Sequence, residues 1–214
     1  MNLVLQDISL LFKGAYYTMI ITLVSMSCGL IIGLFVALAR LIPNCILANL
    51  AKAYVSIIRG TPVLVQIFII YYGLPDLGIV LEPLPAAFIS LSINIGAYLS
   101  EAIRGAIISI PKGQMEAAMC IGMTYWQAMR RIILPQAARV AIPPMGNTFI
   151  GMLKETSLVS VITVTELLRA SQLLISKHLV VMPFYIAIAL MYWVMSTIFS
   201  MALGRLEIKL SKNY

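Results

Sequence analysis

Charged side chains are scarce in this sequence. Lysine, arginine, aspartate and glutamate make up only 11% of its 214 residues, whereas 61% of the residues are hydrophobic. The three cysteines (Cys28, Cys45 and Cys120) are too scattered for a metal motif or a disulfide framework. The single histidine, His178, is interpreted as a loop residue rather than a ligand. We therefore expect no metal site.

Two further absences narrow the function. No G-x-x-x-x-G-K-[ST] phosphate loop is present, so the chain is not expected to be an enzyme that hydrolyses ATP. No internal repeat is visible, which argues against the duplicated architecture of many secondary transporters. A soluble core of this length cannot hide so many apolar residues, so the composition predicts an all-α membrane protein in a lipid bilayer.

Five apolar segments are long enough to cross a bilayer, whose core needs about 20 residues of helix. The fourth is the least regular because Lys154 and Glu155 lie in its middle, and a hydropathy profile alone would count four. The whole chain, 1–214, is interpreted as one membrane domain. The expected spans cover residues 16–39, 55–72, 84–108, 144–165 and 181–203.

The net charge of +7 is distributed unevenly. With five spans and an outer N-terminus, most of the 15 lysines and arginines fall on the inner side, and only Lys13, Arg169 and Lys177 fall outside. This asymmetry satisfies the positive-inside rule, so an N-out, C-in topology is predicted. The basic residues flank apolar spans and form no aromatic-rich patch, so no nucleic acid partner is expected.

The first span contains Gly29, Gly33 and Ala37 at four-residue intervals. Such spacing indicates close helix packing. We expect the partner to be either the fifth span or a second subunit.

The segment between the third and fourth spans, residues 111–142, has a helical pattern. Gly122 interrupts the pattern and Pro135 is expected to end it, so two short helices joined at a glycine bend are predicted. Apolar residues recur at intervals of three or four, as in helices that bind a groove on a partner protein. Periodicity alone leaves an amphipathic helix at the membrane interface equally open. The stripe consists of Met115, Met119, Met123, Trp126, Met129 and Ile133.

The same segment contains a spaced signature. Glu116-Ala117-Ala118 is followed after three residues by Gly122, and after nine more by an Ile-x-Leu-Pro sequence that ends at Pro135. This spacing resembles the EAA loop of permease subunits in bacterial ATP-binding cassette (ABC) importers. Three further stretches are similar to polar amino acid permeases of the histidine, glutamine and arginine type: Arg59-Gly60-Thr61-Pro62, residues 100–105 (SEAIRG) and residues 153–160 (LKETSLVS).

The resemblance implies a type I ABC importer fold with a cytoplasmic coupling helix. It also implies four kinds of partner: two ABC ATPase subunits that carry ATP and Mg²⁺, a second permease subunit (a copy or a paralogue), an extracytoplasmic amino-acid-binding protein, and the amino acid itself. The expected function is ATP-driven import of a polar amino acid across the bacterial inner membrane. The residues assigned to coupling with the ATPase are Glu116, Ala117, Ala118, Gly122, Arg130 and Pro135.

Two other classes of function compete with this interpretation. A stand-alone secondary carrier or channel could use the charges of the fourth span, but five spans without a repeat argue against it. An intramembrane enzyme would need a Ser/His, paired Asp or metal set within the membrane, and His178 is expected outside.

Lys154 and Glu155 are the strongest candidates for a substrate pathway. A charge at mid-membrane depth costs about 2.5–3.5 kcal/mol, so such residues usually face a protein interior or a water-filled cavity. Neighbouring helix positions point about 100° apart, so the two side chains cannot bond tightly together, whereas an amino acid zwitterion offers both signs. Thr156 and Ser157 add hydroxyl groups. An internal ion pair or helix-packing site is the alternative.

The second and third spans supply a weaker set of pathway candidates. Asn94 and Tyr98 are four residues apart and are expected to share a helix face opposite the fourth span, together with Gln66. Interhelical hydrogen bonding is the open alternative. Glu101 and Arg104 are expected to form an ion pair that fixes the helix entering the coupling loop.

Overall fold

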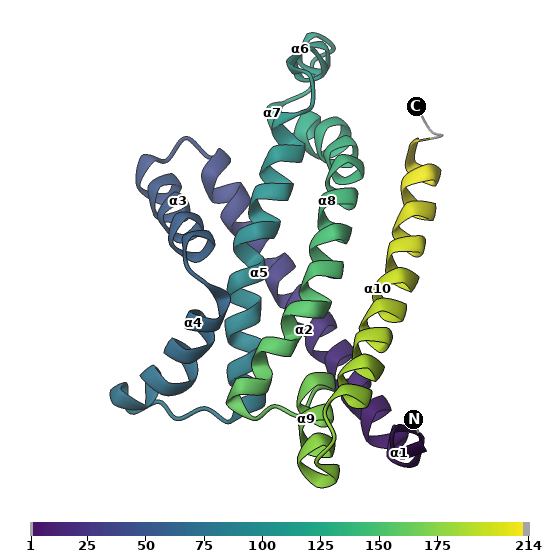
Figure 1. Cartoon of the computed structure of the whole chain (residues 1–214). Coiled ribbons are helices and arrows are strands. Elements are labelled where there is room, and N and C mark those ends of the chain that lie inside the picture. The colour runs from purple at the N-terminus through teal and green to yellow at the C-terminus, as the bar shows by residue number, and fades with distance from the viewer. Residues whose placement is uncertain (1, 212–214) are drawn as a thin grey trace.

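The computed structural model describes residues 2–211, and the regular elements in this range are all helices (Figure 1). Short π and 3-10 segments, labelled η, join several of the α-helices. In chain order the elements are α1 Asn2–Gln6, α2 Ile8–Leu41, α3 Cys45–Gly60, α4 Val63–Phe68, η1 (π) Ile69–Gly73, η2 (3-10) Leu74–Leu77, α5 Pro83–Ile108, α6 Lys112–Cys120, α7 Tyr125–Ala128, η3 (π) Met129–Ile133, α8 Leu134–Glu155, η4 (3-10) Thr156–Ile162, α9 Leu167–His178 and α10 Met182–Ser211.

Three single helices, α2, α5 and α10, are long and apolar enough to cross a membrane. Two broken helices add to them: α3 with the segment Val63–Leu77, bent by 106°, and Tyr125–Ile162 with α9, bent by 49°. The first break falls at Thr61-Pro62, because a proline has no N–H to donate and keeps the residue before it out of the helical region. With each bent pair counted as one span, the structure provides up to five spans, which is the number that the sequence predicts. The predicted second span, 55–72, is not one straight helix, because the first break falls inside it.

The helices define two ends of the molecule (Figure 1). The α6 end carries α6 and the C-terminal end of α10, and the α9 end carries α9 and the N-terminal helix α1. At 1.5 Å per residue the 34 residues of α2 extend about 51 Å, well beyond the roughly 30 Å of a bilayer core, so α2 is long enough to cross even when strongly tilted. Helix α1 and the last turns of α10 lie at opposite ends, as an odd number of crossings requires.

The glycines of α2 pack against α5. A Cβ atom on Gly33 would lie 2.9 Å from Leu99 Cβ and 3.0 Å from the carbonyl oxygen of Gly96, so only glycine permits this approach. A Cβ atom on Gly29 would lie closer still to a neighbour, the side chain of Ile95. The expectation that these residues contact the fifth span or a second subunit is therefore wrong. The third span takes that place, and small residues on both helices let the two backbones meet.

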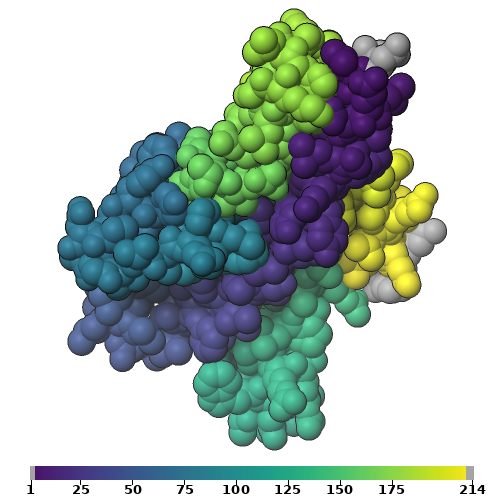
Figure 2. All heavy atoms as spheres, turned by 90° about the horizontal axis from the view of Figure 1, so that it is seen from below, coloured from purple at the N-terminus to yellow at the C-terminus, as the bar shows by residue number. Residues whose placement is uncertain are grey.

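Asp7, Lys177 and His178 form an ion-pair cluster at the α9 end, called the clasp below. Lys177 Nζ donates to Asp7 Oδ1 at 2.9 Å, and His178 Nε2 lies 2.6 Å from Asp7 Oδ2. The His178 ring also stacks on Phe184, with 5.7 Å between ring centroids. His178 is the last residue of α9, so the prediction that it lies in a loop is wrong. Figure 2 looks onto this end and shows the N-terminal segment beside α9.

The clasp predicts a pH-dependent contribution to stability. The hydrogen bonds from Lys177 and His178 hold the pKa of the Asp7 carboxyl below its ordinary value of 3.8. A lowered native pKa stabilises the fold at neutral pH, and the contribution disappears as the pH falls below 3.8 and through the native pKa. Asp7→Asn should therefore lower the Tm of the purified protein slightly at pH 7 and leave it unchanged in strong acid.

Thermal unfolding in detergent, measured from strong acid up to pH 7, determines this difference. Asp76→Asn is the matched control, because Asp76 makes no ion pair within residues 2–211. A Tm difference for Asp7→Asn that does not change with pH would contradict the assignment.

Candidate functional site

The segment predicted to couple the protein to an ATPase, called the coupling segment below, projects beyond the helix bundle at the α6 end (Figure 1). It consists of α6, a bend at Gly122, and α7, which is the pair of short helices that the sequence predicts. Glu116 and Ala117 are exposed on α6, whereas Ala118 is buried. Arg130 is exposed one residue into η3.

Local hydrogen bonds fix the bend. The Gly122 N–H donates to the Met119 carbonyl at 3.0 Å and the Met123 N–H donates to the Ala118 carbonyl at 3.1 Å, which is the Schellman pattern of a helix end. Gly122 has a φ of +83°, a conformation that favours glycine. The next helix begins at once with a capping box between Thr124 and Gln127. The angle between α6 and α7 is therefore set by the segment itself.

Pro135 does not end the second helix, contrary to the prediction. It is the second residue of α8, which continues from α7 through the π segment η3 to Glu155. A proline ring clashes with the carbonyl four residues earlier, and the wider π turn relieves this clash. The same arrangement recurs where η1 precedes Pro75. The sequence pattern shows the proline but not the π turn that accommodates it.

The apolar stripe of the segment divides into two groups. Ile133 is buried, and Met115 and Met129 pack against a cluster formed by the ends of α5 and α8. Met119 and Trp126 are exposed, by 55% and 72%, and with Ile121 and Tyr125 they form an apolar tip. Of the six stripe residues, Met119 and Trp126 are therefore the two that are exposed to a partner. The periodicity did not distinguish these two from the residues that anchor the segment.

Lys154 and Glu155 lie at the end of α8, where the α-helix changes to the 3-10 segment η4. Both side chains are exposed, and neither makes an ion pair within residues 2–211. Thr156 is fully buried and donates to the Leu153 carbonyl at 2.8 Å. Ser157 is half-buried and donates to the Lys154 carbonyl at 2.7 Å.

Gln66 and Asn94 are joined to each other. Asn94 Nδ2 donates to Gln66 Oε1 at 3.0 Å, and Gln66 Nε2 donates to the Ile58 carbonyl at 2.8 Å and to Thr61. Both side chains are buried, and their bonds brace the sharp break between α3 and α4 against α5. This geometry favours the interhelical interpretation for the pair. The side chain of Tyr98, by contrast, is 41% exposed. The Arg59 guanidinium lies over its ring, with 5.3 Å between Arg59 Cζ and the ring centroid.

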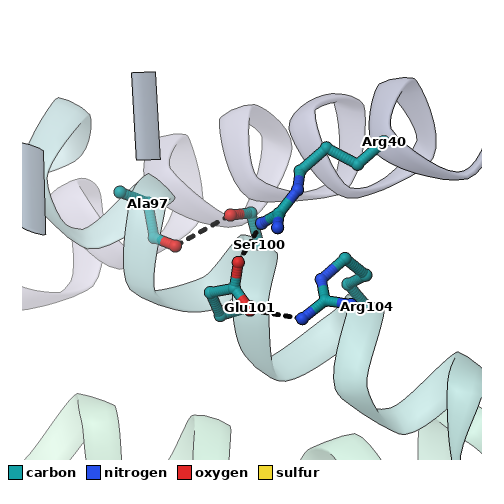
Figure 3. Close-up of polar contacts among 5 residues, drawn as sticks. All are labelled: Arg40, Ala97, Ser100, Glu101 and Arg104. Atoms are coloured by element: carbon teal, nitrogen blue, oxygen red, sulfur yellow. Dashed lines mark hydrogen bonds and ion pairs between the residues drawn. The ribbon is translucent and has the colours of Figure 1, made fainter. Parts of the chain in front are cut away.

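Glu101 binds two arginines (Figure 3). Arg104 Nη2, one turn further along α5, donates to Glu101 Oε2 at 2.7 Å. Arg40 Nη1, in the last turn of α2, bonds the other carboxylate oxygen. The sequence indicates the first contact by its three-residue spacing, but Arg40 is 61 residues away and no local pattern points to it. We call these three residues the arginine–glutamate cluster.

A hollow of about 420 Å³ opens at the α9 end, on the face shown in Figure 2. The hollow is lined by Lys13 and Tyr17 of α2, by Glu82, which directly precedes α5 in the chain, and by Thr163 and Thr165. Lys13 and Glu82 have opposite charges and make no ion pair within residues 2–211. Polar groups of both signs are therefore available at the end opposite the coupling segment.

The family comparison decides the identity. Residues 29–212 match the family described as the binding-protein-dependent transport system inner membrane component. The chain belongs to this family. Among the relatives of this permease are the L-cystine transport system permease protein TcyB of Bacillus subtilis (strain 168), 45% identical over 95% of this chain and 87% of TcyB, and the glutamine transport system permease protein GlnP of Escherichia coli (strain K12), 40% identical over 94% of this chain and 92% of GlnP.

Solved structures agree with the family assignment. The crystal structure of an amino acid ABC transporter with histidines superposes on this permease with a TM-score of 0.93, at 37% identity over 96% of both chains. An inward-facing structure of the MetNI methionine ABC transporter superposes with a TM-score of 0.80 at 21% identity, over 94% of this chain and 96% of that one, which supports the fold alone. The resemblance to type I importer permeases, and the inner-membrane location, are thus confirmed.

Proposed function

We propose that this permease forms one half of the membrane-spanning part of an ATP-driven importer for a polar amino acid. The observation that carries the proposal is the close superposition, over almost the full length, on the permease chain of an amino acid ABC transporter at 37% identity. Relatives named for cystine and for glutamine transport support a polar amino acid as substrate. The nucleotide and Mg²⁺ belong to two partner ATPase subunits.

The α6 end would then be cytoplasmic and the α9 end extracytoplasmic. This N-out, C-in orientation follows from the positive-inside rule. The apolar tip of the coupling segment, flanked by Glu116 and Arg130, would bind a groove of the ATPase. The hollow near Lys13 and Glu82 would face the binding protein that delivers the amino acid.

The substrate pathway would run between two permease subunits. Lys154 and Glu155 are exposed on the single chain, and contact with lipid would cost about 2.5–3.5 kcal/mol for each charge. A water-lined interface with the second permease avoids that cost. There Lys154 can bind the carboxylate of an amino acid and Glu155 its ammonium group, with the Ser157 hydroxyl beside them.

Dependence on the ATPase tests the function. In proteoliposomes that contain the permease, the ATPase and the binding protein, uptake of labelled glutamine, cystine or arginine should require ATP. An ATPase variant without its phosphate-loop lysine should reduce uptake to the level of empty vesicles, because this permease supplies no nucleotide site of its own. Uptake that persists with this variant would favour a secondary carrier or channel and contradict the proposal.

A further inference from the structure

The break between α3 and α4 carries an arginine without an ion-pair partner. Arg59 is the last but one residue of α3, about 21 Å along the helix from Cys45. In Figure 1 α3 lies toward the α6 end and α4 toward the α9 end, so their junction lies between the two ends. The Arg59 side chain is exposed, and within residues 2–211 it makes no ion pair. A charge inside a span usually faces protein or a water-filled cavity rather than lipid.

The guanidinium of Arg59 has its hydrogen-bond donors free. It lies over the ring of Tyr98 on α5, with 5.3 Å between Arg59 Cζ and the ring centroid. This contact uses the face of the ring and consumes no N–H group. The side-chain N–H groups of Arg59 form no hydrogen bond with any other part of residues 2–211. A planar fork of donors is therefore held in place and open to an acceptor.

The backbone that carries Arg59 is fixed to α5. Gln66 Nε2 donates to the Ile58 carbonyl at 2.8 Å, and Asn94 Nδ2 donates to Gln66 Oε1 at 3.0 Å. Ile58 directly precedes Arg59, and Asn94 lies one helical turn before Tyr98. The bonds thus hold the helix of the arginine against the helix of the tyrosine. A cation positioned before its ligand arrives loses less conformational entropy on binding.

The nearby acidic residue of α5 is not available to Arg59. Glu101 lies three residues after Tyr98, but Arg40 and Arg104 bond its two carboxylate oxygens (Figure 3). Arg59 is also close enough for its charge to act on that of Arg40. Three arginines therefore surround one carboxylate, and this excess of positive charge attracts an anion.

We propose that Arg59 and Tyr98 form a second binding site for the substrate carboxylate, on the α6 side of Lys154, from which the amino acid leaves toward the cytoplasm. The inference rests on the proposed function. Helix α8 reaches Lys154 only near its end toward α9, so the two sites lie at different depths (Figure 1). Arginine binds a carboxylate through two parallel N–H···O bonds, and the Tyr98 ring holds the guanidinium for this contact.

Equilibrium binding to the purified permease–ATPase complex tests the site without ATP and without the binding protein. Labelled glutamine, cystine and arginine are the probes, and each is compared with its α-amide, which lacks the carboxylate charge. All variants carry Lys154→Ala, so that the first site does not hold the carboxylate. Arg59→Gln is then compared with Lys52→Gln. Lys52 is the matched control, because it is an exposed cation of the same helix and makes no ion pair within residues 2–211.

Lys154→Ala alone should still bind the amino acid. Adding Arg59→Gln should weaken this binding about ten- to hundredfold, the usual effect of losing a hydrogen bond to a charged group, and adding Lys52→Gln should change it less than twofold. The amide should bind weakly, and Arg59→Gln should not weaken it further. Loss of all binding in Lys154→Ala alone would overturn the proposal. An equal effect of Arg59→Gln on the amino acid and on its amide would also overturn it, because it would show a merely structural role.

A carboxylate of the second permease subunit is the competing occupant. If the amino acid is the occupant, Arg59→Gln should leave the Tm and the mass of the complex unchanged. A lower Tm together with loss of the second permease would show that Arg59 binds across the subunit interface, and the proposed site would be wrong.

The vesicle assay separates this inference from the proposed function. If uptake requires ATP but Arg59→Gln leaves amino acid binding unchanged, the second site is wrong and the importer function stands. If uptake does not require ATP, the importer function is wrong, whatever Arg59 binds.

Discussion

Lys154→Ala is expected to lower amino acid uptake more than tenfold while the permease still assembles with its ATPase. A hydrogen bond to a charged group contributes about 1.5–3 kcal/mol, which corresponds to roughly ten- to hundredfold in affinity or rate. Lys154 makes no ion pair within residues 2–211, so its ammonium group is free for a substrate carboxylate. Glu155→Gln keeps the shape of its side chain, removes the negative charge, and should impair uptake similarly.

Transport assays with copurification of the ATPase check this prediction. Lys209→Ala is the matched control, since Lys209 is an exposed lysine in the last turn of α10, far along the chain from the proposed pathway. Its uptake should stay within about twofold of the original. Normal uptake by Lys154→Ala, or a loss that only follows a loss of assembled complex, would remove Lys154 from the pathway.

Gly122→Val should abolish coupling, with uptake reduced tenfold or more and with loss of the ATP hydrolysis that the loaded binding protein stimulates. The left-handed conformation costs an L-residue about 1–2 kcal/mol, and a β-branched side chain tolerates it least. No atom lies within 4 Å of the position of a Cβ on Gly122, so the effect arises from the backbone and not from a clash. The expected consequence is an altered angle between α6 and α7.

Gly122→Asn provides the test of this cause. Asparagine adopts the left-handed conformation more readily than other residues with a side chain, so this variant should retain most of its coupling. Uptake and stimulated ATP hydrolysis by the two variants can be measured in the same vesicles. Equal loss in Gly122→Asn and Gly122→Val would show that the side chain, rather than the backbone angle, interferes with docking.

The sequence predicts features that depend on local chemistry. The bend at Gly122 follows from a glycine within a helical pattern, and the Glu101–Arg104 contact follows from three-residue spacing. The number of spans follows from apolar length. The resemblance of the EAA, Gly and Ile-x-Leu-Pro spacing to the permease family is confirmed by the match over residues 29–212. The roles of individual residues in coupling and in the pathway stay predictions.

The sequence does not predict contacts between segments that are far apart along the chain. The bond between Gln66 and Asn94 spans 28 residues and that between Arg40 and Glu101 spans 61, and no periodic pattern encodes such pairs. Pro135 does not end the helix, because proline is tolerated in the first turn of a helix and a π turn relieves the clash of its ring. Periodicity predicts a single face for the methionine stripe, because it cannot tell an anchored side chain from an exposed one.

The π segment η3 has a mechanical consequence. It keeps the helix continuous from Tyr125, at the tip proposed to bind the ATPase, to Glu155, beside the proposed substrate pathway. These 31 positions extend about 45 Å at 1.5 Å per residue. A tilt imposed at one end of this helix would be carried toward the other, and the π turn and Pro143-Pro144 inside α8 are the points where the helix bends most easily. A movement of the ATPase would thus displace Lys154 and Glu155 by rotating α8, the helix that carries them.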